Sequence, residues 1–82
     1  MPTVMRFDGL RVVIYPNDHR PAHVHVMGGG HEAVFRLRCP HGPPELRENH
    51  GFRPAELTHI HETLTHALAG LCEAWRHWHD DY

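Results

Sequence analysis

The first part of the chain alternates short apolar, β-branched runs with turn residues. The runs TVMRF, at 3–7, and LRVVIY, at 10–15, are separated only by Asp8 and Gly9. An Asp-Gly pair between two such runs is typical of a type I′ turn, in which both central residues have positive φ. The pattern therefore predicts a β-hairpin with strands at 3–7 and 10–15.

A third strand is predicted at 23–27, where the sequence is HVHVM. Side chains two residues apart on a strand point to the same side of the sheet. Val24 and Val26 would therefore lie on one face, with His23 and His25 on the other.

A fourth strand is predicted at 32–38, after three consecutive glycines that favour a turn. A loop rich in proline follows, in which a short edge strand is expected at 45–47. Within 32–38, Ala33, Phe35 and Leu37 would share one face, and Glu32, Val34, Arg36 and Arg38 the other.

The last third of the chain has the periodicity of a helix. Pro54 and Glu56 suit the first turn of a helix, although Arg53 is an unusual N-cap residue. Apolar spacings of three and four predict a helix at 54–79, either continuous or broken near Gly70. The stripe consists of Leu57, Ile60, Leu64, Ala67, Leu71, Ala74 and Trp78, and is widened by Leu68, Cys72 and Trp75.

These elements predict a single α+β domain over 1–82. A small antiparallel sheet of four or five strands, beginning with a hairpin, would be covered on one face by a long C-terminal helix. A length of 82 residues allows one modest core, and an apolar content of 40% favours a packed core over disorder.

Charge and the remaining composition narrow the class of protein. The net charge is −2 with histidines neutral, which argues against attachment to nucleic acid by bulk charge, although eleven histidines would make the chain cationic in mild acid. The sequence has no signal-peptide pattern and no membrane-spanning run, so we expect a cytoplasmic protein with no membrane contact.

The spacing of Cys39 and Cys72 matches neither a zinc ribbon nor a C-x-x-C motif, which predicts two free thiols.

The stretch NDHRPAHVHV, at 17–26, carries the clearest chemistry. Two imidazoles on one strand face could bind one metal ion, or could act as general acid and general base around a phosphodiester. In the acid–base alternative, His23 and His25 are catalytic and Asp18 orients one of them. In the metal alternative, His19, His23 and His25 bind zinc, nickel or copper.

Other polar residues could complete such a site or could be ordinary surface residues. Arg20, Arg36 and Arg38 could hold an anionic substrate. Helical spacings of three and four bring two further groups together: His59 with Glu62 and His66, and Glu73 with His77. Each group could chelate a metal ion, but exposed helical residues at these spacings more often form solvated side-chain pairs without a metal. Histidine is so frequent in this chain that a structural or partner-binding role for the cluster stays open.

The order of the motifs resembles a known bacterial family, domain of unknown function 4160. The resemblance rests on Met-Pro-Thr-Val at 1–4, Asn-Asp-His at 17–19 and Pro21 followed by His-Val-His-Val at 23–26. It continues with Gly-Phe at 51–52, Pro-x-Glu-Leu at 54–57 and Glu-Ala-Trp at 73–75. Arg53 departs from the pattern, since the family more often has Ser there.

The resemblance implies a function class but no catalytic residues. Members of this family are often encoded beside a second small family, domain of unknown function 2442, and such pairs look like type II toxin–antitoxin modules. By that analogy the chain is the toxin-like component, with a cognate antitoxin-like protein as partner and RNA as the substrate of a metal-independent ribonuclease. A metal-binding protein and a non-enzymatic interaction domain are the alternatives, and open sheet edges are compatible with a homodimer.

Overall fold

The computed structural model describes residues 3–82. Met1 and Pro2, which begin the family-like opening and the expected 1–82 domain, lie outside the described residues. The elements in chain order are β1 (Thr3–Phe7), β2 (Leu10–Val13), β3 (His23–Gly28), β4 (His31–Arg36), β5 (Glu45–His50), α1 (Pro54–His66) and α2 (Leu68–His79).

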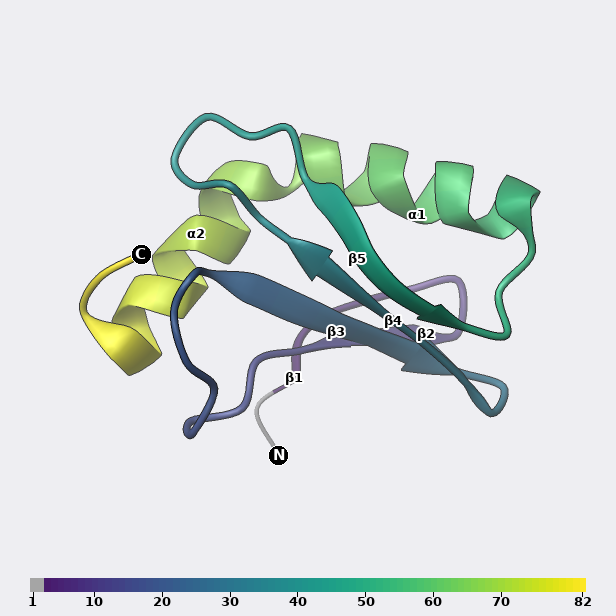
Figure 1. Ribbon diagram of the computed structural model, residues 1–82, viewed down its shortest axis with the longest axis horizontal. Helices are drawn as coiled ribbons and strands as arrows, with labels where there is room; N and C mark the ends of the chain where they lie inside the picture. The colour runs from purple at the N-terminus through teal and green to yellow at the C-terminus, as the bar shows by residue number, and fades with distance from the viewer. Residues whose placement is uncertain (1–2) are drawn as a thin grey trace.

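The five strands form one antiparallel sheet in which the spatial order is the chain order, β1-β2-β3-β4-β5. Both helices pack on one face of this sheet, so the predicted α+β class is confirmed (Figure 1). Neither helix in residues 3–82 is both long enough and apolar enough to cross a membrane.

Tight turns connect the first four strands in two hairpins. Asp8 and Gly9 have φ values of 50° and 77°, which confirms the turn predicted from the Asp-Gly pair. Gly29 and Gly30, with φ values of 58° and 82°, form the equivalent turn between β3 and β4. A residue with a Cβ is disfavoured at such angles, which explains the glycines.

Two strands end earlier than predicted. β2 ends at Val13 instead of residue 15, because the backbone N–H of Tyr15 donates to the Asp18 carboxylate at 2.9 Å and leaves the sheet. β4 runs from His31 to Arg36 instead of 32–38: the Leu37 N–H still donates to the Ala22 carbonyl at 2.9 Å, but Arg38, with a φ of 59°, is not extended.

The prediction that Arg36 and Arg38 share a sheet face is therefore wrong. Arg38 lies beyond β4 and has a φ of 59°, so strand alternation no longer applies to it. The edge strand expected at 45–47 exists and is longer, Glu45–His50, with every residue exposed.

The C-terminal helix is divided, and the break is at Ala67, not near Gly70. Ala67 has φ −99° and ψ 6°, and serves as C-cap of α1 and N-cap of α2. The break changes which residues face the sheet. Trp78, expected in the apolar stripe, is 43% exposed, whereas the side chains of α2 that are buried are Leu68, Leu71, Cys72 and Trp75.

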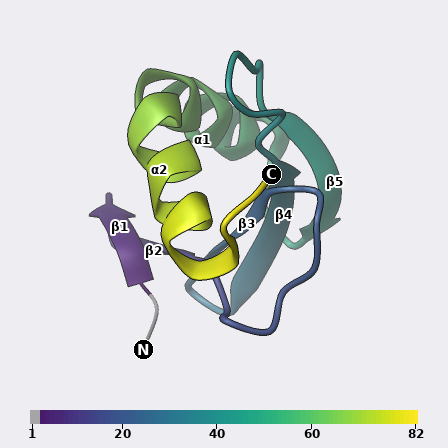
Figure 2. The same ribbon diagram turned by 90° about the vertical axis from the view of Figure 1, so that its left-hand side faces the viewer.

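The core lies between the sheet and the two helices, which Figure 2 shows from one end. The alternation predicted for the central strands is confirmed: Val24 and Val26 of β3, and Ala33 and Phe35 of β4, are almost completely buried. The apolar face of the sheet and the apolar faces of the helices bury each other from water. This burial is the main stabilisation available to a chain of this size.

Cys39 and Cys72 form a disulfide, so the prediction of two free thiols is wrong. The bond links the proline-rich loop after β4 to the buried face of α2, across a sequence separation of 33 residues. The sequence spacing could not reveal it, because only the folded chain brings the two cysteines together.

Candidate metal centre

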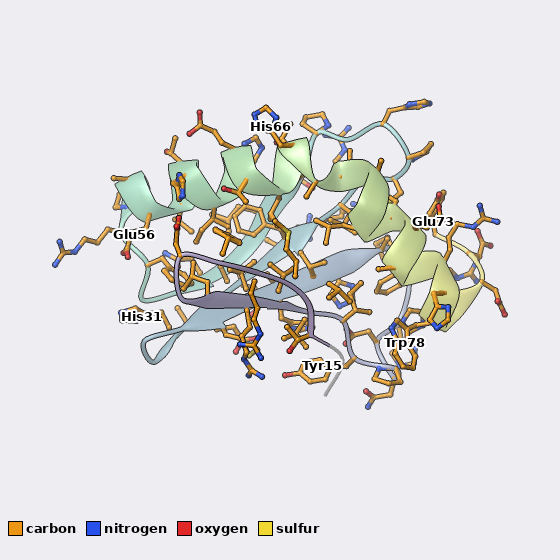
Figure 3. The ribbon with its side chains drawn as sticks, turned by 180° about the vertical axis from the view of Figure 1, so that it is seen from behind. Tyr15, His31, Glu56, His66, Glu73 and Trp78 are labelled. Carbon is orange, nitrogen blue, oxygen red and sulfur yellow. A yellow bond between two sulfur atoms is a disulfide. The ribbon has the colours of Figure 1, made fainter. Side chains whose placement is uncertain are left out.

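The histidines of β3 lie on the sheet face away from the core. His25 is paired across the sheet with Val13 on one side and Val34 on the other. The Tyr15 ring packs edge-on against the His25 ring with centroids 5.0 Å apart, and Figure 3 shows Tyr15 on the side of the sheet opposite the helices. This face is therefore partly covered by the loop between β2 and β3.

Strand geometry brings His23 and His25 together as predicted. Their ring centroids are 5.2 Å apart, and their side chains are 21% and 16% exposed. The His23 ring also contacts the ring of Trp75, a buried residue of α2, with centroids 5.2 Å apart. Aromatic neighbours on both sides hold the two imidazoles in place and limit their contact with water.

Asp18 reaches the same point from the preceding loop. Its Oδ2 atom is 3.3 Å from His25 Nε2 and 3.6 Å from His23 Nε2. A turn fixes this position, because the Asp18 N–H donates to the Tyr15 carbonyl and the Tyr15 N–H donates to Oδ2. One ligand atom from each of the three side chains lies within 4.8 Å of the others, as the ligands of a single ion would.

The other ring nitrogen of each histidine is also engaged. His23 Nδ1 is 2.9 Å from the Pro21 carbonyl oxygen, and His25 Nδ1 is 3.1 Å from Glu32 Oε2. A carbonyl and an ionised carboxylate only accept hydrogen bonds, so in both rings we assign the proton to Nδ1. In the neutral imidazoles, Nε2 then carries a lone pair.

With these tautomers, both Nε2 atoms and the Asp18 carboxylate oxygen near them are hydrogen-bond acceptors. The Nε2 atom of His25 is buried and has no hydrogen-bond partner within residues 3–82, although Asp18 Oδ2 is only 3.3 Å away. A buried acceptor without a donor is unfavourable. A cation at this point would be held by all three atoms, with Pro21 and Glu32 orienting the rings from behind, as the outer partners of metal-binding histidines do.

A family model described as Domain of unknown function (DUF4160) matches residues 9–76 of this chain. The chain belongs to that family. The match covers Asp18, His23 and His25, so the whole cluster lies in the DUF4160 region. No curated protein and no solved structure matches the chain.

The third metal ligand predicted for this DUF4160 chain is not the one that the structure brings to the cluster. His19 is exposed and lies on a pocket beside the cluster, whereas Asp18, predicted to orient an imidazole, joins the group with His23 and His25. The predicted helical pairs are not part of any group of three within residues 3–82. Instead His59 pairs with Asp8, and Figure 3 shows His66 and Glu73 on the outer side of the helices.

The predicted anion-binding arginines separate into two places. Arg20 and Arg36 border a pocket of about 440 Å³ with His23, and Arg38 borders only a neighbouring pocket of about 660 Å³. Arg47 also borders the first pocket, which the sequence did not predict. The pairing of Glu32 with His25 was not predicted either. Alternation in β4 already placed Glu32 on the histidine face, but only the pairing of β3 with β4 shows which imidazole it meets.

Proposed function

We propose that this protein binds one divalent first-row transition-metal ion through Asp18, His23 and His25. The observation that supports the proposal most strongly is the convergence of the two Nε2 atoms on Asp18 Oδ2, with each Nδ1 atom already occupied. The proposal keeps the predicted pair of imidazoles and replaces His19 by Asp18.

The ligand set indicates the class of ion. Two imidazole nitrogens and one carboxylate oxygen suit zinc, nickel, copper or ferrous iron, whereas calcium and magnesium prefer oxygen alone. Sites with three protein ligands generally keep further coordination positions for water or substrate, as catalytic zinc sites do. We therefore infer a reactive metal centre and not a structural one.

The same geometry disfavours the metal-independent ribonuclease. A general acid and a general base must each lie within hydrogen-bond distance of the substrate proton or atom that they serve. Here both free nitrogens face one carboxylate oxygen of the protein itself. The toxin-like role, the antitoxin-like partner and the cytoplasmic location stay predictions from the sequence and from the family resemblance.

Calorimetric titration of metal into protein prepared without a histidine tag tests the proposal. The disulfide is kept oxidised so that the cysteines do not compete as thiolate ligands. We expect about one equivalent of zinc, nickel or copper to bind, and His23→Gln combined with His25→Gln to abolish that event.

Asp18→Asn is the matched variant for the third ligand. An asparagine oxygen can still accept from the Tyr15 N–H and so preserve the turn, but it is a much poorer ligand. His66→Ala removes an exposed helical histidine and serves as control. Unchanged stoichiometry and affinity in the two ligand variants, or equal loss in the control, would overturn the proposal.

A further inference from the structure

A basic pocket adjoins the candidate metal centre, and His23 belongs to both. The pocket is bordered by His19, Arg20, Pro21, His23, Val34, Arg36 and Arg47. Arg36 of β4 is the direct cross-strand partner of His23. A group bound in this pocket would therefore lie next to a ligand of the proposed metal.

The three arginines of the pocket are available to a ligand. Arg36 forms no ion pair within residues 3–82. Arg20 pairs with Asp81 at 3.0 Å and Arg47 with Glu45 at 3.6 Å, but all four of those side chains are between 46% and 70% exposed. Exposed pairs of this kind contribute little free energy, so an incoming anion can replace them.

We propose that this pocket binds the phosphate group of a phosphate ester substrate beside the metal ion. The proposal rests on the proposed function, because it names the substrate class of that metal centre. Three guanidinium groups offer more donors and more charge than one carboxylate needs, and their planar forks match the oxygens of a phosphate. The chain as a whole is acidic, at −2, so this basic site is local and does not reflect the overall charge.

The neighbouring pocket extends the site in one direction. It shares Pro21 and Arg36 with the first pocket and adds Arg38, His41 and Tyr82, together with Glu45, whose carboxylate pairs with Arg47. The two pockets together could hold more than one phosphate-sized group. A nucleoside monophosphate and a short single-stranded RNA present the same phosphate chemistry, and they differ in whether the second pocket is needed.

The test is a binding titration with inorganic phosphate, adenosine monophosphate and a single-stranded RNA tetranucleotide, followed by amide chemical shifts. It is made first on metal-free protein and then with one equivalent of zinc. We expect phosphate-dependent shifts at the pocket in the metal-free protein and tighter binding with zinc. Arg36→Gln should weaken phosphate binding roughly tenfold or more, because it removes charge-assisted hydrogen bonds.

Two variants make the result specific. Arg36→Lys keeps the charge and loses the fork, so its affinity should be intermediate. Arg6→Gln removes an exposed arginine of β1 that borders neither pocket, so its affinity should be unchanged. If Arg38→Gln weakens binding of the RNA but not of the monophosphate, the substrate is a polynucleotide. If the monophosphate and the RNA bind with equal affinity, and Arg38→Gln changes neither affinity, the substrate is a phosphate monoester.

Failure of this proposal is distinct from failure of the metal proposal. Phosphate binding to metal-free protein requires no metal, so it can succeed where zinc fails to bind. Zinc binding without any phosphate binding, or phosphate binding that Arg36→Gln leaves unchanged, would overturn the phosphate site and leave the metal centre intact.

Discussion

The two faces of β3 put neighbouring residues to opposite uses. Val24 and Val26 are completely buried under the helices, where they contribute apolar area to the core. His23 and His25 alternate with them, yet their imidazoles lie among polar partners from a loop and from β4. One strand therefore supplies both the core and the candidate site.

This difference shows how a chain of 82 residues combines a core with a candidate site. The covered face needs only apolar groups of the right size, and it positions the strand rigidly. The open face then needs few additional contacts to hold two imidazoles in fixed orientations. If this account is right, substitutions on the covered face change stability, and substitutions on the open face change metal affinity.

The largest expected effect is on the covered face. Phe35→Ala should lower the free energy of unfolding by about 3–5 kcal/mol, because a fully buried aromatic ring leaves a cavity. Urea denaturation measures this loss. Val34→Ala, one residue along β4 on the other face, is the matched control and should cost much less; equal losses would contradict the division between the two faces.

Loss of the disulfide should have the next largest effect. Replacing both Cys39 and Cys72 by alanine should destabilise the protein by about 3–4 kcal/mol, since the bond closes a loop of 33 residues. Thermal unfolding with and without reductant checks the value for the native chain. Metal stoichiometry at a temperature where the variant is folded should be unchanged, because neither cysteine belongs to the candidate site.

Metal should stabilise the folded protein by an intermediate amount. At a free zinc concentration of one hundred times the dissociation constant, linkage gives about 2.7 kcal/mol of added stability. Thermal shift measurements should show this gain in the native chain and little of it in Asp18→Asn. A full gain in that variant would place the metal elsewhere.

The smallest predicted effect concerns the partner of His25. Glu32→Ala removes the carboxylate that accepts from Nδ1 and leaves all three proposed ligands in place, so zinc affinity should fall roughly tenfold. Calorimetry can resolve this change. Glu48→Ala, on the neighbouring strand β5, should leave the affinity unchanged.

Alternation within strands predicted much of the fold and two of the three residues of the candidate site. The two imidazoles of β3 and the buried residues Ala33 and Phe35 follow directly from a period of two. The break at Ala67 could not be predicted, because Gly70 is the weaker helix former of the two, yet Gly70 lies inside α2.

Contacts that depend on loops were harder to predict. His19 and Asp18 are adjacent, and only the turn closed by Tyr15 determines which of them reaches the imidazoles. Arg47 reaches the basic pocket from β5, where the pairing with β4 shifts by one residue between Val34 and Phe35. Alternation counted along the sequence cannot anticipate such a shift.

Long-range ¹H–¹⁵N correlation spectra report directly which nitrogen of each imidazole carries the proton and whether the other binds metal. In the metal-free protein at a pH where histidines are neutral, His23 and His25 should both carry the proton on Nδ1. On addition of one equivalent of zinc, their Nε2 signals should shift and the signals of the other nine of the eleven histidines should not. A proton on Nε2 of either ring, or zinc-dependent shifts at other histidines with these two unaffected, would contradict the account.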